Sequence, residues 1–112
     1  MPIIHTTDLP WKSTPVNGVS AKELIHERQG TGKLIQLVPG ARYPEHRHPD
    51  KLEYVYVLDG TLTMQLDQET LEAKSGDFVE IPQNHLHTLE NWTSRDVVLW
   101  VGAVMLDGPD RA

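Results

Sequence analysis

The chain has 112 residues, which is enough for one domain with a single core and too few for two. It contains no cysteine, so disulfides, thiolate metal sites and cysteine nucleophiles are excluded. A net charge of -6 disfavours nucleic acid or an anionic membrane surface as the main partner, because either would repel the protein. We therefore expect one compact unit that binds neither nucleic acid nor membrane.

The amino end shows no targeting signal, since Met1 to His5 is followed at once by polar residues. We therefore expect a cytoplasmic protein. The longest apolar run, Val97 to Leu106, has ten residues, about half of what a membrane helix needs. This run is predicted to be a core strand.

Short strand-like runs separated by Gly, Pro, Asn and Asp fill the chain, and no segment has helical periodicity. The pattern predicts an all-β protein with essentially no helix, built as a sandwich or jelly roll. Asp59-Gly60 predicts a type I′ hairpin turn, and Asp67-Gln68-Glu69 predicts a second turn. The expected strands are Lys22 to Glu27, Lys33 to Val38, Glu53 to Leu58, Thr61 to Leu66, Thr70 to Lys74, Asp77 to Ile81, His85 to Asn91 and Val97 to Met105.

Side chains alternate along a strand, which assigns two faces to the run from Glu53 to Leu58. One face carries Glu53, Val55 and Val57, and the other carries two tyrosines and Leu58. Both faces are largely apolar, so the strand should be covered on both sides. A barrel interior covers only one side, so a partner subunit or a folded-back terminal arm should cover the other. The simplest expectation is a homodimer.

Four of the six histidines form two pairs, His46 with His48 and His85 with His87. Each pair is spaced i, i+2, which places both rings on one face of an extended strand. Such a surface could chelate a metal ion.

Glu53 lies an odd number of residues after His48, so a continuous strand would turn its carboxylate away from the imidazoles. The intervening Pro49-Asp50 predicts a turn that resets this phase. We therefore expect Glu53 to begin the next strand beside the two histidines.

The spacing of these residues follows two motifs. The stretch from Gly40 to Gly60 fits G-x5-H-x-H-x4-E-x6-G at every specified position. The stretch from Gly76 to Asn91 fits G-x5-P-x-G-x2-H-x3-N except that Asn84 replaces a glycine, and asparagine is the side chain that best tolerates a left-handed turn. In these motifs the chain resembles the cupins.

Resemblance to the cupins implies a jelly-roll barrel, or double-stranded β-helix, that often dimerises through its outer strands. It also implies a mononuclear site for one divalent metal ion, with four ligands: His46, His48, Glu53 and His87. Three imidazoles and one carboxylate suit Fe, Mn, Ni, Co, Cu or Zn and leave positions open on a six-coordinate ion. The site would keep a net charge of about +1, which favours an anionic oxygen ligand such as an enolate or carboxylate.

The remaining histidines receive no metal-binding role. His85 is interpreted as an exposed loop residue, with a proton carrier near the metal as the alternative. His5 and His26 are interpreted as structural or exposed.

The aromatic residues are interpreted mainly as packing groups. Tyr54 and Tyr56 point outward by strand parity, and Tyr43 is expected on a loop. Trp11 and Trp92 are candidates to line the mouth of the barrel.

The chain is predicted to form one domain with three parts. Residues 1–30 form an N-terminal arm with the first strand or strands, in possible contact with a dimer partner. Residues 31–106 form the barrel, and residues 107–112 form a tail.

Three classes of function stay open, because one fold of this kind hosts many activities. The first is a dioxygenase-type oxidoreductase acting on a small organic acid or enolisable substrate. The second is a redox-neutral isomerase, lyase or decarboxylase that uses the ion as a Lewis acid and needs a proton carrier, for which His85 is the candidate. The third is a non-catalytic metal or ligand sensor. We expect a metal enzyme with a small-molecule substrate, and the sequence assigns no catalytic residue.

Overall fold

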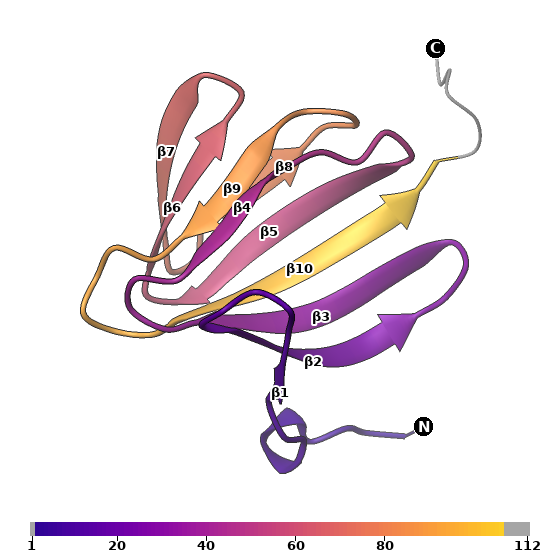
Figure 1. Ribbon diagram of the computed structural model, residues 1–112. Helices are drawn as coiled ribbons and strands as arrows, with labels where there is room; N and C mark the ends of the chain where they lie inside the picture. The colour runs from indigo at the N-terminus through magenta and orange to yellow at the C-terminus, as the bar shows by residue number, and fades with distance from the viewer. Residues whose placement is uncertain (1, 107–112) are drawn as a thin grey trace.

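The computed structural model describes residues 2–106 and consists almost entirely of β-strands (Figure 1). A single 3₁₀ turn, η1 (Thr6–Asp8), is the one helical element in these residues. The strands in chain order are β1 (Lys12–Ser13), β2 (Val19–His26), β3 (Gly30–Leu37), β4 (Arg42–His46), β5 (Lys51–Asp59), β6 (Thr61–Leu66), β7 (Glu69–Lys74), β8 (Phe78–Ile81), β9 (His87–Glu90) and β10 (Val97–Met105).

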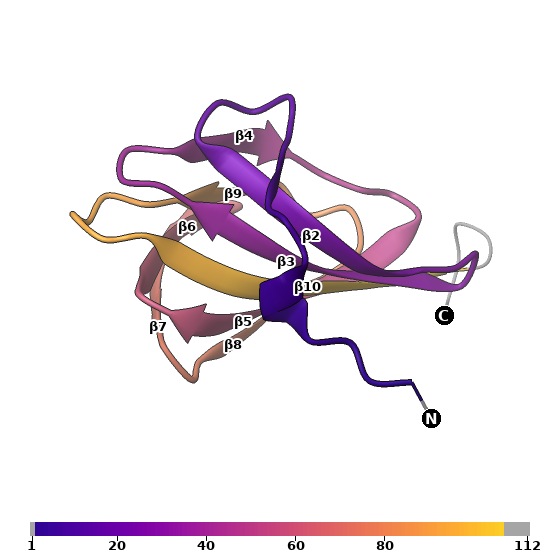
Figure 2. The same ribbon diagram turned by 90° about the horizontal axis from the view of Figure 1, so that it is seen from below.

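The strands form a six-stranded sheet in the order β1-β2-β3-β10-β5-β8 and a four-stranded sheet in the order β4-β9-β6-β7. All neighbours pair antiparallel. Figures 1 and 2 show the sheets as two curved layers that face each other. The ladders of residues 2–106 do not close into one continuous ring, and the two-layer arrangement is that of a jelly roll. The predicted all-β fold is confirmed.

The hydrophobic core lies between the two sheets. Leu37, Val55 and Leu99 from the six-stranded sheet are fully buried, as are Leu62 and Met64 from the four-stranded sheet. Burial of each such side chain contributes roughly 1.5–3 kcal/mol to folding. Because inward and outward residues alternate, the core determines which side chains of each strand can reach an interior site.

The outer face of β5, β8 and β10 is also rich in aromatic residues. The rings of Tyr54 and Phe78 stack with centroids 5.3 Å apart, and Trp100 Nε1 donates a hydrogen bond of 3.2 Å to the Tyr54 hydroxyl. Tyr56, Leu58 and Phe78 nevertheless remain 39%, 42% and 60% exposed. The outward orientation predicted for Tyr54 and Tyr56 is therefore correct, and the expected cover by a partner stays a prediction.

Several predicted strand boundaries were wrong. Strand β4 was absent from the expected strands. It contains Pro44 and lies at the edge of its sheet, where proline is tolerated. The two-residue strand β1 was not predicted, and β2 begins at Val19, earlier than expected. Strand β9 begins only at His87, because Asn84 adopts a left-handed φ of 67° and keeps His85 in the preceding turn.

The predicted hairpin at Asp59-Gly60 was also wrong. Strands β5 and β6 belong to different sheets, so Gly60, with φ of 87°, forms a corner at which the chain changes layer. The tight hairpin is instead the second predicted turn, where Asp67 (φ of 54°) and Gln68 connect the paired strands β6 and β7.

The predicted N-terminal arm contains η1, β1 and β2, and β2 pairs with β3 within the six-stranded sheet. The predicted tail, 107–112, lies outside the described residues. In residues 2–106, no helix is long and apolar enough to span a membrane.

Candidate metal centre

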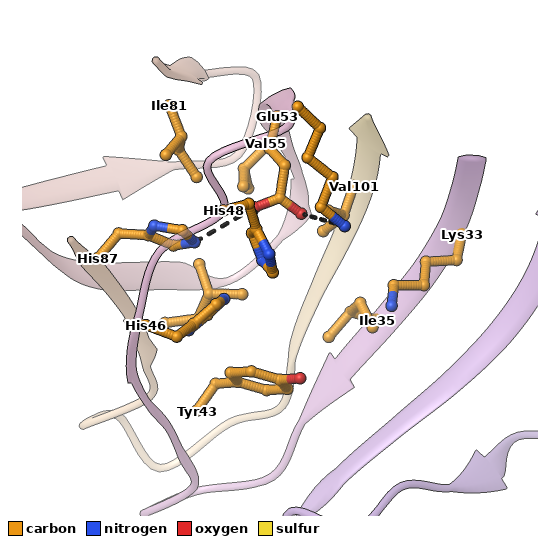
Figure 3. A pocket seen from close by; sticks show the side chains of 12 residues that line it. Lys33, Ile35, Tyr43, His46, His48, Glu53, Val55, Ile81, His87 and Val101 are labelled. Atoms are coloured by element: carbon orange, nitrogen blue, oxygen red, sulfur yellow. Dashed lines mark ion pairs between the residues drawn. The ribbon is translucent and has the colours of Figure 1, made fainter. Parts of the chain in front are cut away.

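The structure brings the four predicted ligands together at the interior of the jelly roll (Figure 3). His46 ends β4, His48 lies in the loop that follows, Glu53 lies on β5 and His87 begins β9. Their ligand atoms all lie within 4.8 Å of one another. Because β4 pairs with β9 so that His46 lies opposite His87, the two sequence motifs meet at one site.

Local turns explain why these side chains converge. The chain turns at Pro49-Asp50, as predicted, and β5 then starts at Lys51 with Glu53 on the same inward face as Val55. The i, i+2 spacing alone was a poor guide, since His48 lies beyond the end of β4 and His85 lies before the start of β9.

Backbone carbonyl groups orient two of the imidazoles. His46 Nδ1 lies 2.8 Å from the Pro44 carbonyl oxygen, and His87 Nδ1 lies 3.0 Å from that of His85. A carbonyl only accepts hydrogen bonds, so Nδ1 carries the proton in both rings. The Nε2 atom is thereby left to bind a metal ion.

Glu53 is the negative centre of the cluster. Its Oε1 lies 3.3 Å from His87 Nε2 and 3.4 Å from His48 Nε2, and its Oε2 lies 3.9 Å from Lys51 Nζ. Figure 3 shows the carboxylate between these groups.

The donor set fits one divalent ion. Metal-ligand bonds of about 2.0–2.2 Å place two ligand atoms at most ~4.4 Å apart on a shared ion. The spread of 4.8 Å needs only a small inward movement of side chains. Three imidazoles and a carboxylate are donors that several divalent transition metals accept, so the cluster does not select one of them.

The surroundings of His46 and His48 favour the neutral form of both imidazoles. Burial lowers the pKa of His46 and of His48, outweighing the hydrogen bond to Pro44 and the attraction of Glu53. Both imidazoles are therefore neutral at neutral pH, as metal binding requires.

His87 and Glu53 behave as a pair. Burial lowers the pKa of His87 and raises that of Glu53, but the contact between the two groups reverses both tendencies. The pKa of His87 is consequently raised and that of Glu53 is lowered. In the metal-free protein, a proton on His87 thus occupies the position that a cation would take beside Glu53.

The four residues border a pocket of about 120 Å³. Its aliphatic lining consists of Ile35, Val55, Ile81, Leu89 and Val101. Polar residues that the sequence reasoning did not assign to the site also line it, namely Lys33, Tyr43 and Lys51.

Tyr43 was expected on a loop, but it lies on β4, and its ring centroid is 4.9 Å from that of His46. Parity could have found Lys33, which alternates along β3 with the inward residues Ile35 and Leu37. No local signal identifies Tyr43, because its strand was itself missed.

The other highlighted residues lie away from the pocket. His85 is 45% exposed at its side chain, and its Nδ1 lies 2.5 Å from the Asp67 carboxylate. His5 and His26 are exposed. Neither candidate for the mouth of the barrel lines the pocket: Trp11 packs against Lys22, and Trp92 donates a hydrogen bond to the Glu90 carboxylate.

Residues 33–103 match the family model described as the Cupin domain. The chain belongs to the cupin family. It is 40% identical over 58 residues to polyketide synthase CurC from Streptomyces cyaneus, covering 52% of this chain and 38% of CurC. It is 37% identical over 98 residues to quercetin 2,3-dioxygenase from Bacillus subtilis, covering 75% of this chain and 29% of that enzyme. The chain thus spans well under half the length of either relative.

Among solved structures, KdgF from a Halomonas species superposes with a TM-score of 0.84 over 99% of this chain and 96% of KdgF. The sequences are only 18% identical, so this likeness shows the fold alone.

The departure from the second cupin motif is mild in the structure. Asn84 takes the left-handed conformation that the motif's glycine would supply. The motif's last residue, Asn91, is fully buried and donates hydrogen bonds to the carbonyls of Leu37 and Arg95. This asparagine therefore holds the fold together and does not take part in the metal centre.

Proposed function

We propose that this cupin is a mononuclear metal enzyme, a dioxygenase-type oxidoreductase acting on a small organic acid or enolisable substrate. The observation that carries the proposal is the convergence of three imidazoles and one carboxylate on a pocket that aliphatic side chains line in part. Such a donor set leaves open positions on a six-coordinate ion. The similarity to quercetin 2,3-dioxygenase supports the oxidative class.

His46, His48, Glu53 and His87 would hold the ion. When bound, a redox-active dication would supply Lewis acidity and a path for electrons between substrate and dioxygen. The single carboxylate, Glu53, would leave the centre with net positive charge and so favour an anionic substrate group. Apolar walls such as Ile35, Val55 and Val101 would exclude water from the reacting groups.

A redox-neutral isomerase or lyase is less well supported. That class needs a proton carrier, and its candidate, His85, lies on the surface beside Asp67. A non-catalytic sensor would need the metal or a ligand but no turnover.

The test is oxygen consumption by protein loaded anaerobically with iron(II), screened against β-diketones, catechols, flavonols and small thiol acids. We expect substrate-dependent uptake that disappears in the His48→Ala variant. No uptake across the panel, with zinc held tightly, would contradict the dioxygenase proposal and favour the redox-neutral and sensor classes.

A further inference from the structure

One cation in the pocket lacks a visible role in the metal centre. Lys33 lies on β3 at an inward position, two residues before Ile35, and lines the pocket. Its register partner on β10 is Val101, another pocket residue. Figure 3 shows the Lys33 amine directed toward the pocket from the side away from His87.

Within residues 2–106, Lys33 forms no salt bridge and no side-chain hydrogen bond. Its neighbour across the strands, Glu23, instead lies 3.7 Å from His26. Lys51, the other lysine of the pocket, differs because it lies near Glu53. Lys33 as a residue is half-buried and pairs with Val101 on one side. An inward lysine without a counter-ion favours an anionic ligand, which would neutralise its charge.

A hydrogen-bond donor lies on the same side of the pocket. Tyr43 lines it from β4, and Figure 3 shows its hydroxyl on the side toward Lys33 and Ile35. In the part of the chain that the structure describes, this hydroxyl has no hydrogen-bond partner. A phenol and an ammonium group together can bind both oxygens of a carboxylate.

We propose that Lys33, assisted by Tyr43, binds a carboxylate of the substrate at the end of the pocket opposite His87. The substrate class is then a small bifunctional acid, with one oxygen group for the metal and a carboxylate for Lys33. This inference rests on the proposed metal enzyme and makes its substrate more specific. The volume of about 120 Å³ agrees, because it is below the ~300–1,000 Å³ of sites for drug-sized ligands.

The test is calorimetric binding of malonate, pyruvate and acetoacetate to the zinc-loaded protein, with their neutral amides as matched probes. Lys33→Met keeps the aliphatic stem and removes the charge. We expect it to weaken binding of at least one acid by about tenfold or more, with zinc content and melting temperature unchanged. Lys33→Arg should retain most of the affinity. The control Lys74→Met removes the same charge from an exposed position on β7 and should change nothing.

Several outcomes would overturn the proposal. Acid affinity equal in Lys33→Met and wild type would show that Lys33 only covers the apolar wall with its stem. If Lys33→Met lost as much affinity for the neutral amides as for the acids, the positive charge of Lys33 would not be what binds the ligand. No saturable binding of any of the acids to wild type would also refute it.

Zinc content, measured separately, reports on the proposed metal site. If the wild-type protein binds no metal, the acids are titrated into the metal-free protein. Weaker acid binding by Lys33→Met would then support the carboxylate site, although the proposed metal enzyme would be wrong.

Discussion

Glu53 carries the charge balance of the metal centre. Its carboxylate contacts His48 and His87 through one oxygen and lies near Lys51 through the other. These cationic or protonatable neighbours keep it ionised despite burial. A bound dication would strengthen the same preference, so the role of ligand suits Glu53 better than that of a general base.

Replacing His48 by alanine tests the ligand set at the scale of one residue. We expect zinc affinity to fall by more than about tenfold while the fold is retained, because His48 lies in a loop outside the core. Zinc titration and thermal unfolding by circular dichroism measure the two effects. His26→Ala, on an exposed part of β2, is the control and should leave both unchanged. Loss of cooperative unfolding in His48→Ala would show instead that the metal is structural.

The pKa shifts predict how acid affects metal binding. The pKa of His87 is raised above its ordinary value of 6.5, so His87 is the last ligand histidine to lose its proton. For the metal-free protein, this shift contributes stability that is complete below about pH 6.5 and is lost as pH rises through the folded pKa. The pH dependence of metal affinity has the opposite sign, because the metal can bind His87 only after its proton has left.

We therefore expect zinc affinity to rise with pH through the folded pKa of His87, with a proton released on binding. Calorimetry in buffers of different ionisation enthalpy measures both quantities. An affinity that is flat across this range would mean that His87 does not bind the ion.

At the scale of elements, the corner between β5 and β6 carries the chain from the six-stranded sheet, which holds Glu53, to the four-stranded sheet. Gly60 occupies this corner with φ of 87°, and a Cβ there would lie 2.8 Å from the Asp96 carbonyl oxygen. Gly40 has nearly the same φ of 85°, but a Cβ there would meet no atom within 4 Å. Comparing alanine substitutions at the two glycines therefore distinguishes the cost of a positive φ from the cost of a steric clash at Cβ.

We expect Gly60→Ala to destabilise the protein more than Gly40→Ala. Both changes carry the left-handed strain of about 1–2 kcal/mol, and only Gly60→Ala adds a clash with backbone. The difference should exceed about 1 kcal/mol in urea unfolding of the metal-free proteins. Equal losses of unfolding free energy in the two variants would show that the backbone near Gly60 moves to accommodate the Cβ without cost.

At the scale of the whole molecule, the outer face of β5, β8 and β10 is an exposed apolar surface. It carries Tyr56, Leu58, Phe78 and Val104, each more than a third exposed, around the stacked Tyr54. An apolar surface of this kind on a sheet commonly marks an interaction site. We propose that a second copy of the chain covers it, as the two-sided apolar pattern of β5 predicts.

Sedimentation should therefore show a dimer. Phe78→Glu places a charge on this face and should shift the equilibrium toward monomer, whereas Val38→Glu, at an exposed position outside it, should not. A clean monomer for wild type at micromolar concentration would contradict the proposal.

The sequence by itself determined the all-β class, the inward face of β5 and the four candidate ligands, because each depends on alternation within one strand or on a short motif with fixed spacing. It could not find β4 or the change of layer at Gly60, because an edge position and a sheet assignment depend on which strands pair. Only the tertiary structure turned His85 toward Asp67 and brought Lys33 and Tyr43 into the pocket. The positions of Lys33 and Tyr43 depend on the pairing of β3 with β10 and of β4 with β9, which joins segments more than 40 residues apart.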